Sequence, residues 1–215
     1  MMKNNKGFTL IELLAVITIM GILMMVAIPT ISRTIENSRK DTFVDMIKNY
    51  VSSVKTMWVG DNLLCGNMPS SAVPLGIYYV EINSMSDSVP VLLEQGGKSP
   101  WGNRDVLGVI AIGVREKEGK RTITYYPAIV DGVHGFNVKP DGSSVVTAWK
   151  DSDKVTRGTL VMSNAKYSAI ASKVGSDWVL NSVSFGIDLN SDGDHDDVIN
   201  GLTEMNVEAI KCVDR

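Results

Sequence analysis

The sequence has few of the residues on which most enzymes depend. Its 215 residues include only two histidines and two cysteines, and they lack the H-E-x-x-H, G-x-S-x-G, Walker A and Rossmann glycine patterns. His134 lies in a glycine-containing turn and His195 in an acidic run, and neither Cys65 nor Cys212 stands in a recognisable nucleophile context. We therefore expect a protein that is not an enzyme.

Charge is absent from one long stretch near the N-terminus. The 20 residues from Leu13 to Ser32 contain no Asp, Glu, Lys or Arg. As a helix with a rise of about 1.5 Å per residue, they would cross roughly 30 Å of hydrocarbon, the thickness of a bilayer core. The stretch therefore predicts a membrane-spanning helix.

A secretory signal peptide does not fit this segment. The charged leader ends at Gly7, before the apolar run, and no small-residue A-x-A site follows that run. Lys3 and Lys6, without any acidic residue, favour a cytoplasmic leader, so the chain after the run is expected outside. Glu12 lies directly before the run, and a carboxylate near the bilayer centre costs about 2.5–3.5 kcal/mol on insertion scales. It therefore requires a partner.

The residues Gly7-Phe8-Thr9-Leu10-Ile11-Glu12-Leu13-Leu14, the apolar continuation and Pro29 resemble the N-terminus of type IV pilins and of type II secretion pseudopilins. The similarity covers about 30 residues of the 215, and the rest of the chain matches these families only in general plan.

This resemblance implies a processing and assembly route. A prepilin peptidase would cut between Gly7 and Phe8, and the new α-amine of Phe8 would be N-methylated. Glu12 would meet the α-amine of a neighbouring subunit, and Pro29 would loosen the helix where subunits pack. Two alternatives stay open, since Glu12 would also suit a plain membrane anchor if it lay near the headgroups, and Pro29 would also simply kink a membrane helix.

Beyond the apolar run, the helix is expected to continue as an amphipathic segment. An apolar stripe recurs at spacings of three and four residues, and Gly60 provides a C-cap. We therefore predict a helix over residues 8–58, of which 8–35 form the membrane and assembly half. The stripe comprises Val44, Ile47, Val51, Val54 and Trp58.

The remaining residues, 59–215, predict a globular head. β-Branched runs favour strands, and the economical architecture is an antiparallel sheet packed on the helix, an α+β pilin fold. The turn Ser99–Asn103 resembles one in pseudopilin heads, although its tryptophan would equally anchor a turn to the core. Strands are expected at 76–82, 106–114, 122–130, 145–149, 159–162 and 178–189, with short helices possible at 91–95 and 164–174.

The cysteine pair predicts a disulfide. In an exported chain, Cys65 and Cys212 are expected to pair, which would tie the C-terminal tail to the segment after the helix. Loop-entropy estimates for the loop that this disulfide would close give a stabilisation of roughly 5 kcal/mol, less any strain. The alternative is an unpaired, buried Cys212.

An acidic run suggests calcium. Oxygen-bearing side chains alternate before a glycine turn, as at the start of a D-x-N-x-D-G calcium loop. Ile199 stands where an EF-hand has its closing glutamate, so a solvated acidic loop remains the alternative. Calcium would be structural, and no other cofactor is expected. The expected ligands are Asp188, Asn190, Asp192, Asp194 and Asp197.

The charge balance argues against nucleic acid as a partner. Removing the leader leaves 19 basic and 24 acidic residues, a net charge of −5. The expected function is a subunit of a type IV pilus-like filament that serves adhesion or motility. It would be anchored first in the cytoplasmic membrane, would be assembled by inner-membrane machinery with other pilins, and would end in a cell-surface filament. The alternatives are a pseudopilin of a secretion or DNA-uptake system and a monomeric, membrane-anchored binding protein.

Overall fold

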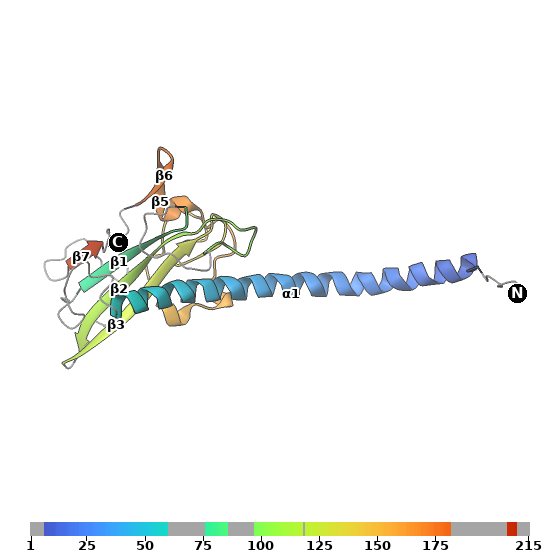
Figure 1. Cartoon of the computed structure of the whole chain (residues 1–215), viewed down its shortest axis with the longest axis horizontal. Coiled ribbons are helices and arrows are strands. Elements are labelled where there is room, and N and C mark those ends of the chain that lie inside the picture. The colour runs from blue at the N-terminus through green and yellow to red at the C-terminus, as the bar shows by residue number, and fades with distance from the viewer. Residues whose placement is uncertain (1–6, 60–75, 86–96, 118, 182–205, 210–215) are drawn as a thin grey trace, which may run out of the picture. The chain divides into compact units, whose positions relative to one another are not determined.

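A computed structural model of the chain describes residues 7–59, 76–85, 97–117, 119–181 and 206–209 (Figure 1). Backbone contacts divide the chain into two units, Met1–Arg39 and Lys40–Arg215. The helix α1 (Leu10–Val59) contributes to both units, and all described strands belong to the second. The strands are β1 (Gly76–Asn83), β2 (Leu107–Lys117), β3 (Lys120–Val130), β4 (Gly135–Phe136), β5 (Ala171–Val174), β6 (Asp177–Leu180) and β7 (Asn206–Ala209).

Helix α1 changes character along its length. This part is apolar on all sides, and every residue from Gly7 to Ile35 is exposed, since no other described residue of its unit covers it. From Phe43 onward the apolar residues fall on one stripe, and Phe43, Ile47 and Val54 are completely buried. The helix begins two residues later than predicted and ends one residue later.

The main sheet has the strand order β4-β3-β2-β1-β7. Pairing is antiparallel from β1 to β4, as predicted, and the three central strands confirm the β-branched runs. A tight hairpin joins β2 to β3, with Lys117 opposite Lys120 and Gly119 in the left-handed region at φ 74°. Strand β7 pairs in parallel with β1, which the sequence analysis did not anticipate.

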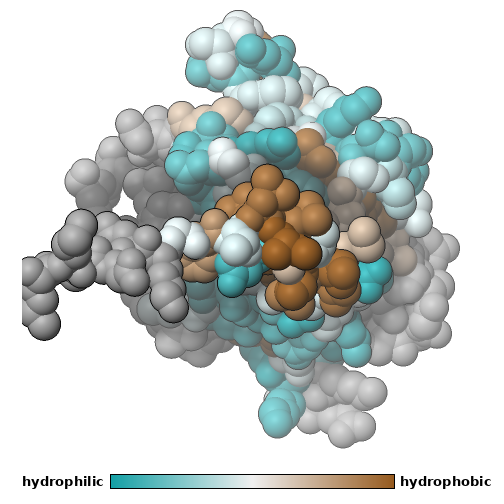
Figure 2. Space-filling view, turned by 90° about the vertical axis from the view of Figure 1, so that its right-hand side faces the viewer, coloured by the Kyte–Doolittle hydropathy of each residue, from teal (hydrophilic) through white to brown (hydrophobic). Residues whose placement is uncertain are grey.

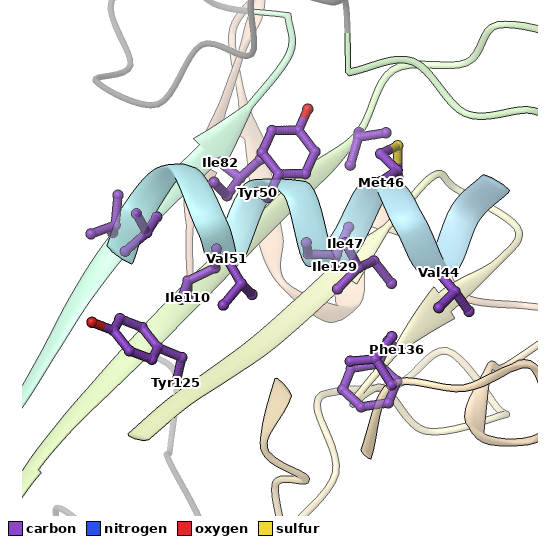
Figure 3. Packing of buried hydrophobic residues seen from close by; sticks show 14 of the residues in the cluster. Val44, Met46, Ile47, Tyr50, Val51, Ile82, Ile110, Tyr125, Ile129 and Phe136 are labelled. Atoms are coloured by element: carbon purple, nitrogen blue, oxygen red, sulfur yellow. The ribbon is translucent and has the colours of Figure 1, made fainter. Parts of the chain in front are cut away.

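One face of the sheet packs against α1. Side chains alternate along a strand, so Ile110, Ile112 and Val114 of β2 point to the same face and join the helix stripe in one core. Figure 3 shows the α1 residues Ile47 and Val51 lying over this face, with Phe136 near Val44 of the same helix. The predicted contact between helix stripe and sheet is confirmed.

The opposite face of the sheet has a second core. Leu107, Val109 and Ala111 of β2 point to this side, where they meet side chains from the irregular chain that follows β4. The covering residues include Val138, Trp149, Ala165, Ala169 and Ile170. Residues 107–114 of β2 are therefore buried on both faces of the sheet, and the head has three layers: helix, sheet and covering segment.

This covering segment, residues 137–170, departs from the predicted strands. Residues 145–149 form no strand and contribute only an isolated bridge between Val138 and Val145. The segment predicted at 159–162 instead begins at the last residue of the 3-10 turn η3 (Arg157–Thr159) and forms an isolated bridge from Val161 to Gly135. The possible helix at 164–174 is a 3-10 turn, η4 (Tyr167–Ala169), followed by β5.

The last predicted strand, 178–189, lies only partly within the described residues. β6 covers Asp177–Leu180, and together with β5 it forms a two-stranded hairpin with Gly175 in the left-handed region at φ 64°. The remainder of the predicted strand, the possible helix at 91–95 and the turn at Gly60 lie outside the described residues.

Candidate processing and assembly site

The predicted cleavage point lies before the helix. Gly7, Phe8 and Thr9 are not helical, and α1 begins at Leu10. The Phe8 side chain is 90 % exposed. A Cβ added at Gly7 would meet nothing within 4 Å, and Gly7 does not occupy the left-handed region, so the fold itself does not require glycine there. The described fold therefore gives no packing reason for a glycine at this position.

Glu12 has a partner within its own chain. Its Oε2 accepts hydrogen bonds from the backbone N–H and the hydroxyl of Thr9, each at 2.8 Å. The backbone N–H of Glu12 lies 3.4 Å from the Thr9 hydroxyl oxygen in return. These reciprocal contacts form a capping box, which satisfies donors that a helix N-terminus leaves unpaired.

Thr9 is the residue that sequence reasoning missed. We interpreted Glu12 through a partner in another subunit or through a position near the headgroups, whereas the spacing T-x-x-E before an apolar run is itself a sequence signature of a capping box. The expected contact between Glu12 and a neighbouring α-amine stays a prediction, and it would be made by a carboxylate that Thr9 already orients.

Hydroxyl groups inside the apolar run are also satisfied locally. Thr18, Thr30 and Ser32 each donate to the carbonyl four residues earlier, at 3.1, 3.1 and 3.0 Å. Pro29 lies within α1 without interrupting it, although its lack of an N–H leaves the Met25 carbonyl without the usual donor. No side-chain hydroxyl between Glu12 and Arg33 thus needs water.

The apolar run forms a large exposed hydrophobic surface. Its large side chains are more than half exposed, and Figure 2, which faces the N-terminal end of the molecule, shows them in brown. Such a continuous apolar surface far exceeds the patches that soluble monomers tolerate. Within the described residues, α1 is the one helix long and apolar enough to cross a membrane. Lipid or other protein must cover it.

Comparison with known families agrees with this geometry. Residues 2–28 match the family model of the prokaryotic N-terminal methylation motif. The chain carries the type IV pilin and pseudopilin signature. The motif implies processing by a prepilin peptidase and assembly into pilus-like filaments, and the apolar helix fits a membrane-anchored precursor. No curated protein and no solved structure gives a significant match to the chain.

Other predicted sites of this pilin-like chain fall elsewhere. Cys65, Cys212 and the proposed calcium ligands Asp188, Asn190, Asp192, Asp194 and Asp197 lie outside the described residues. Among the residues that the structure does describe, no group of three or more His, Cys, Asp or Glu side chains could hold a metal ion.

The turn at Ser99–Asn103 anchors the core of the head. Trp101 is 9 % exposed, and its ring stacks on that of His134 with centroids 3.8 Å apart and meets Phe43 of α1 edge-on at 5.5 Å. The structure thus gives this tryptophan a packing role, which was the second of the two interpretations of the turn.

A buried carboxylate holds this turn in place. Asp131 is fully buried, and its two oxygens accept hydrogen bonds from the Ser99 hydroxyl, the Val133 and His134 N–H groups and the His134 ring. Burial alone would raise the pKa of Asp131, but the hydrogen bonds outweigh it and the pKa lies below its usual value.

Proposed function

We propose that the chain is a structural subunit of a type IV pilus-like filament, assembled through its N-terminal helix. The observation that carries this proposal is the combination of an exposed, non-helical Gly7-Phe8 junction with a helix that is apolar on all sides. The matched methylation motif supports it. Adhesion or surface motility would be tasks of the exposed head surface in such a filament.

The geometry suggests how assembly would use the new N-terminus. Cleavage after Gly7 would create a positive α-amine on Phe8, directly before the Thr9 cap, and N-methylation would preserve that charge. Each subunit then carries one amine and one oriented carboxylate. Between apolar helices, an amine from one subunit and Glu12 from the next would neutralise each other and set the register of packing.

Replacing Glu12 with glutamine tests this mechanism sharply. Glutamine at this position still closes a capping box, so Glu12→Gln keeps the start of the helix and removes only the charge. We expect normal membrane insertion and normal cleavage but a strong loss of filament yield, measured by shearing filaments from cells and quantifying the subunit. Glu36→Gln, on the polar part of the same helix, is the matched control.

Intact-mass analysis of the surface protein tests the other class of function. A chain that begins at N-methylated Phe8 supports a filament subunit. A chain that retains Met1–Gly7 would instead mean a monomeric, membrane-anchored binding protein, for which neither cleavage nor Glu12 matters. Full filament yield from Glu12→Gln would argue against the charge pair while leaving cleavage intact.

A pseudopilin of a secretion or DNA-uptake system remains the second candidate, because the matched motif is common to both families. The length of the filament on cells discriminates between them, since a pilus extends far from the surface and a pseudopilus is short.

We also propose that the head has no enzymatic role. Ser99 and His134 both bind Asp131, so the hydroxyl donates to a carboxylate rather than to an imidazole base. A nucleophilic triad needs the opposite order, with the histidine between the serine and the acid.

For the C-terminal part of the head, we propose the disulfide Cys65–Cys212 and a structural calcium ion in the 188–197 loop, both on the sequence pattern alone. The calcium ion would order the tail that carries Cys212. A melting temperature that a chelator leaves unchanged would rule out the calcium site.

A further inference from the structure

Arg33 and Glu12 are the charged residues that bracket the apolar run. The 20 residues between them carry no charge. Because α1 continues unbroken from Leu10 to Val59, the two residues lie about 32 Å apart along its axis at 1.5 Å per residue. That separation matches the hydrocarbon thickness of a bilayer, about 30 Å.

Nothing between these two residues would stop the helix from sliding through the bilayer. The three hydroxyls of the run are bonded to α1 itself, and every residue of the run is exposed, so no protein surface holds it at one depth. The depth of the helix must therefore be set at its two ends.

Arg33 is suited to fix the outer end. Its side chain is exposed, and within the described residues no salt bridge to it is found. A guanidinium is planar, stays charged and matches the oxygens of a phosphate in bidentate geometry. Pulling it into hydrocarbon is costly, whereas its long stem allows it to reach the headgroups.

A carboxylate of a second copy of the chain fits less well as the partner of Arg33. From Gly7 to Ile35 the only acidic residue is Glu12, at the far end of the run, and the next one, Glu36, already has an interaction partner. A phospholipid phosphate, in contrast, lies at the depth where Arg33 ends the apolar run.

We propose that Arg33 binds the phosphate groups of outer-leaflet phospholipids and thereby sets the depth of the membrane-inserted precursor. Arg33 is then a positioning residue for processing, because it places Glu12 and the Gly7-Phe8 bond at the cytoplasmic boundary. Glu12 would not lie at the bilayer centre before assembly, and it would need a charged partner only once the helix leaves the lipid. This inference rests on the membrane-anchored precursor of the proposed function.

Moving the arginine by one helical turn tests the inference. In a Glu36→Gln background, Arg33→Leu combined with Asn37→Arg shifts the guanidinium about 6 Å toward the head. The helix should follow by the same distance toward the cytoplasm, which brings residue 13 out of the hydrocarbon. We would introduce Leu13→Cys in the full-length precursor, in inverted membrane vesicles without the peptidase, and measure labelling by a membrane-impermeant maleimide.

We expect the shifted variant to label several-fold faster than its Glu36→Gln parent. Arg39→Leu in the same background is the matched control and should label like the parent, because that arginine lies about 9 Å farther out. Cys65 and Cys212 lie across the membrane from the reagent in the proposed orientation.

Equal labelling of parent and shifted variant would overturn the inference. If, in addition, Arg33→Leu alone lowered filament yield, a second copy rather than lipid would be the partner of Arg33. Since the labelling is done on unprocessed precursor, this failure would leave the filament proposal intact, and that proposal fails separately through Glu12→Gln.

Discussion

The two halves of α1 both carry large apolar side chains, but these side chains have opposite surroundings. In the first half, Ile19 and Leu23 are about as exposed as their neighbours on all other sides, at 58 % and 63 %. In the second half, Phe43 and Ile47 are completely buried between the helix and the sheet. A helix whose apolar residues surround it has no single face to bury, whereas a stripe defines one.

This difference shows what each half contributes. The stripe supplies stability to the head through packing, so its side chains are fixed by their neighbours within the chain. The apolar surface around the first half contributes nothing to the folding of the isolated subunit. Free energy is gained from burying this surface only when lipid or other helices cover it. One continuous helix thus joins a folding element to an assembly element.

Truncating one large apolar side chain in each half should give the largest difference in the stability of the head. Phe43→Ala removes a fully buried ring that meets Trp101, and it should destabilise the head by about 3–5 kcal/mol. Ile19→Ala should leave head stability unchanged. Urea unfolding of the full chain in detergent, followed by tryptophan fluorescence, measures this directly because all four tryptophans lie in residues 58–178.

An equal loss of stability from both substitutions would contradict this division of roles. It would mean that the exposed half of α1 packs against the head in solution.

The sequence predicts the central elements of this fold well because their patterns are local. The β-branched run of β2 and the charged turn after it define a hairpin whose partner, β3, is only a few residues away. The apolar stripe of α1 likewise shows its spacing within a few turns. The helix, the central strands and the helix face that packs on the sheet could therefore all be predicted.

The second layer of the head could not be predicted in the same way. Val145 and Trp149 look like a strand by composition, yet they pack on the sheet through irregular chain and one isolated bridge. Such a segment shows no hydrophobic periodicity, because its buried side chains do not recur at a regular spacing. The parallel pairing of β7 with β1 joins residues far apart in the chain, so local patterns carry no information about it.

Asp131 offers the next test, within the head alone. Its carboxylate accepts hydrogen bonds from Ser99, Val133 and His134 while fully buried, so Asp131→Asn should cost about 1–3 kcal/mol at neutral pH by leaving some of these donors unpaired. The effect should be smaller than that of Phe43→Ala, because the shape of the side chain is kept.

The same substitution should change the response to acid. Because the pKa of Asp131 is lowered in the folded head from its usual value of 3.8, its contribution to stability is complete above that pH and is lost as the pH falls through the folded-state pKa. Asp131→Asn should flatten this part of the acid-unfolding curve. Asp153→Asn, at an exposed position of the same head, is the control, and an unchanged acid slope in Asp131→Asn would contradict the role of the buried carboxylate.

The smallest effect is expected where the covering segment meets α1 at the surface. Arg157 forms a bidentate ion pair with Asp41, near the start of the helix stripe, but both side chains are about half exposed to water. Water and salt screen such a pair, and ordering two long side chains offsets much of its attraction. Arg157→Gln should therefore change the melting temperature of the full chain only slightly, and raising the salt concentration should remove even that difference. A large drop in melting temperature that persists in high salt would show that the ion pair, and not the buried side chains beneath it, holds this segment to the helix.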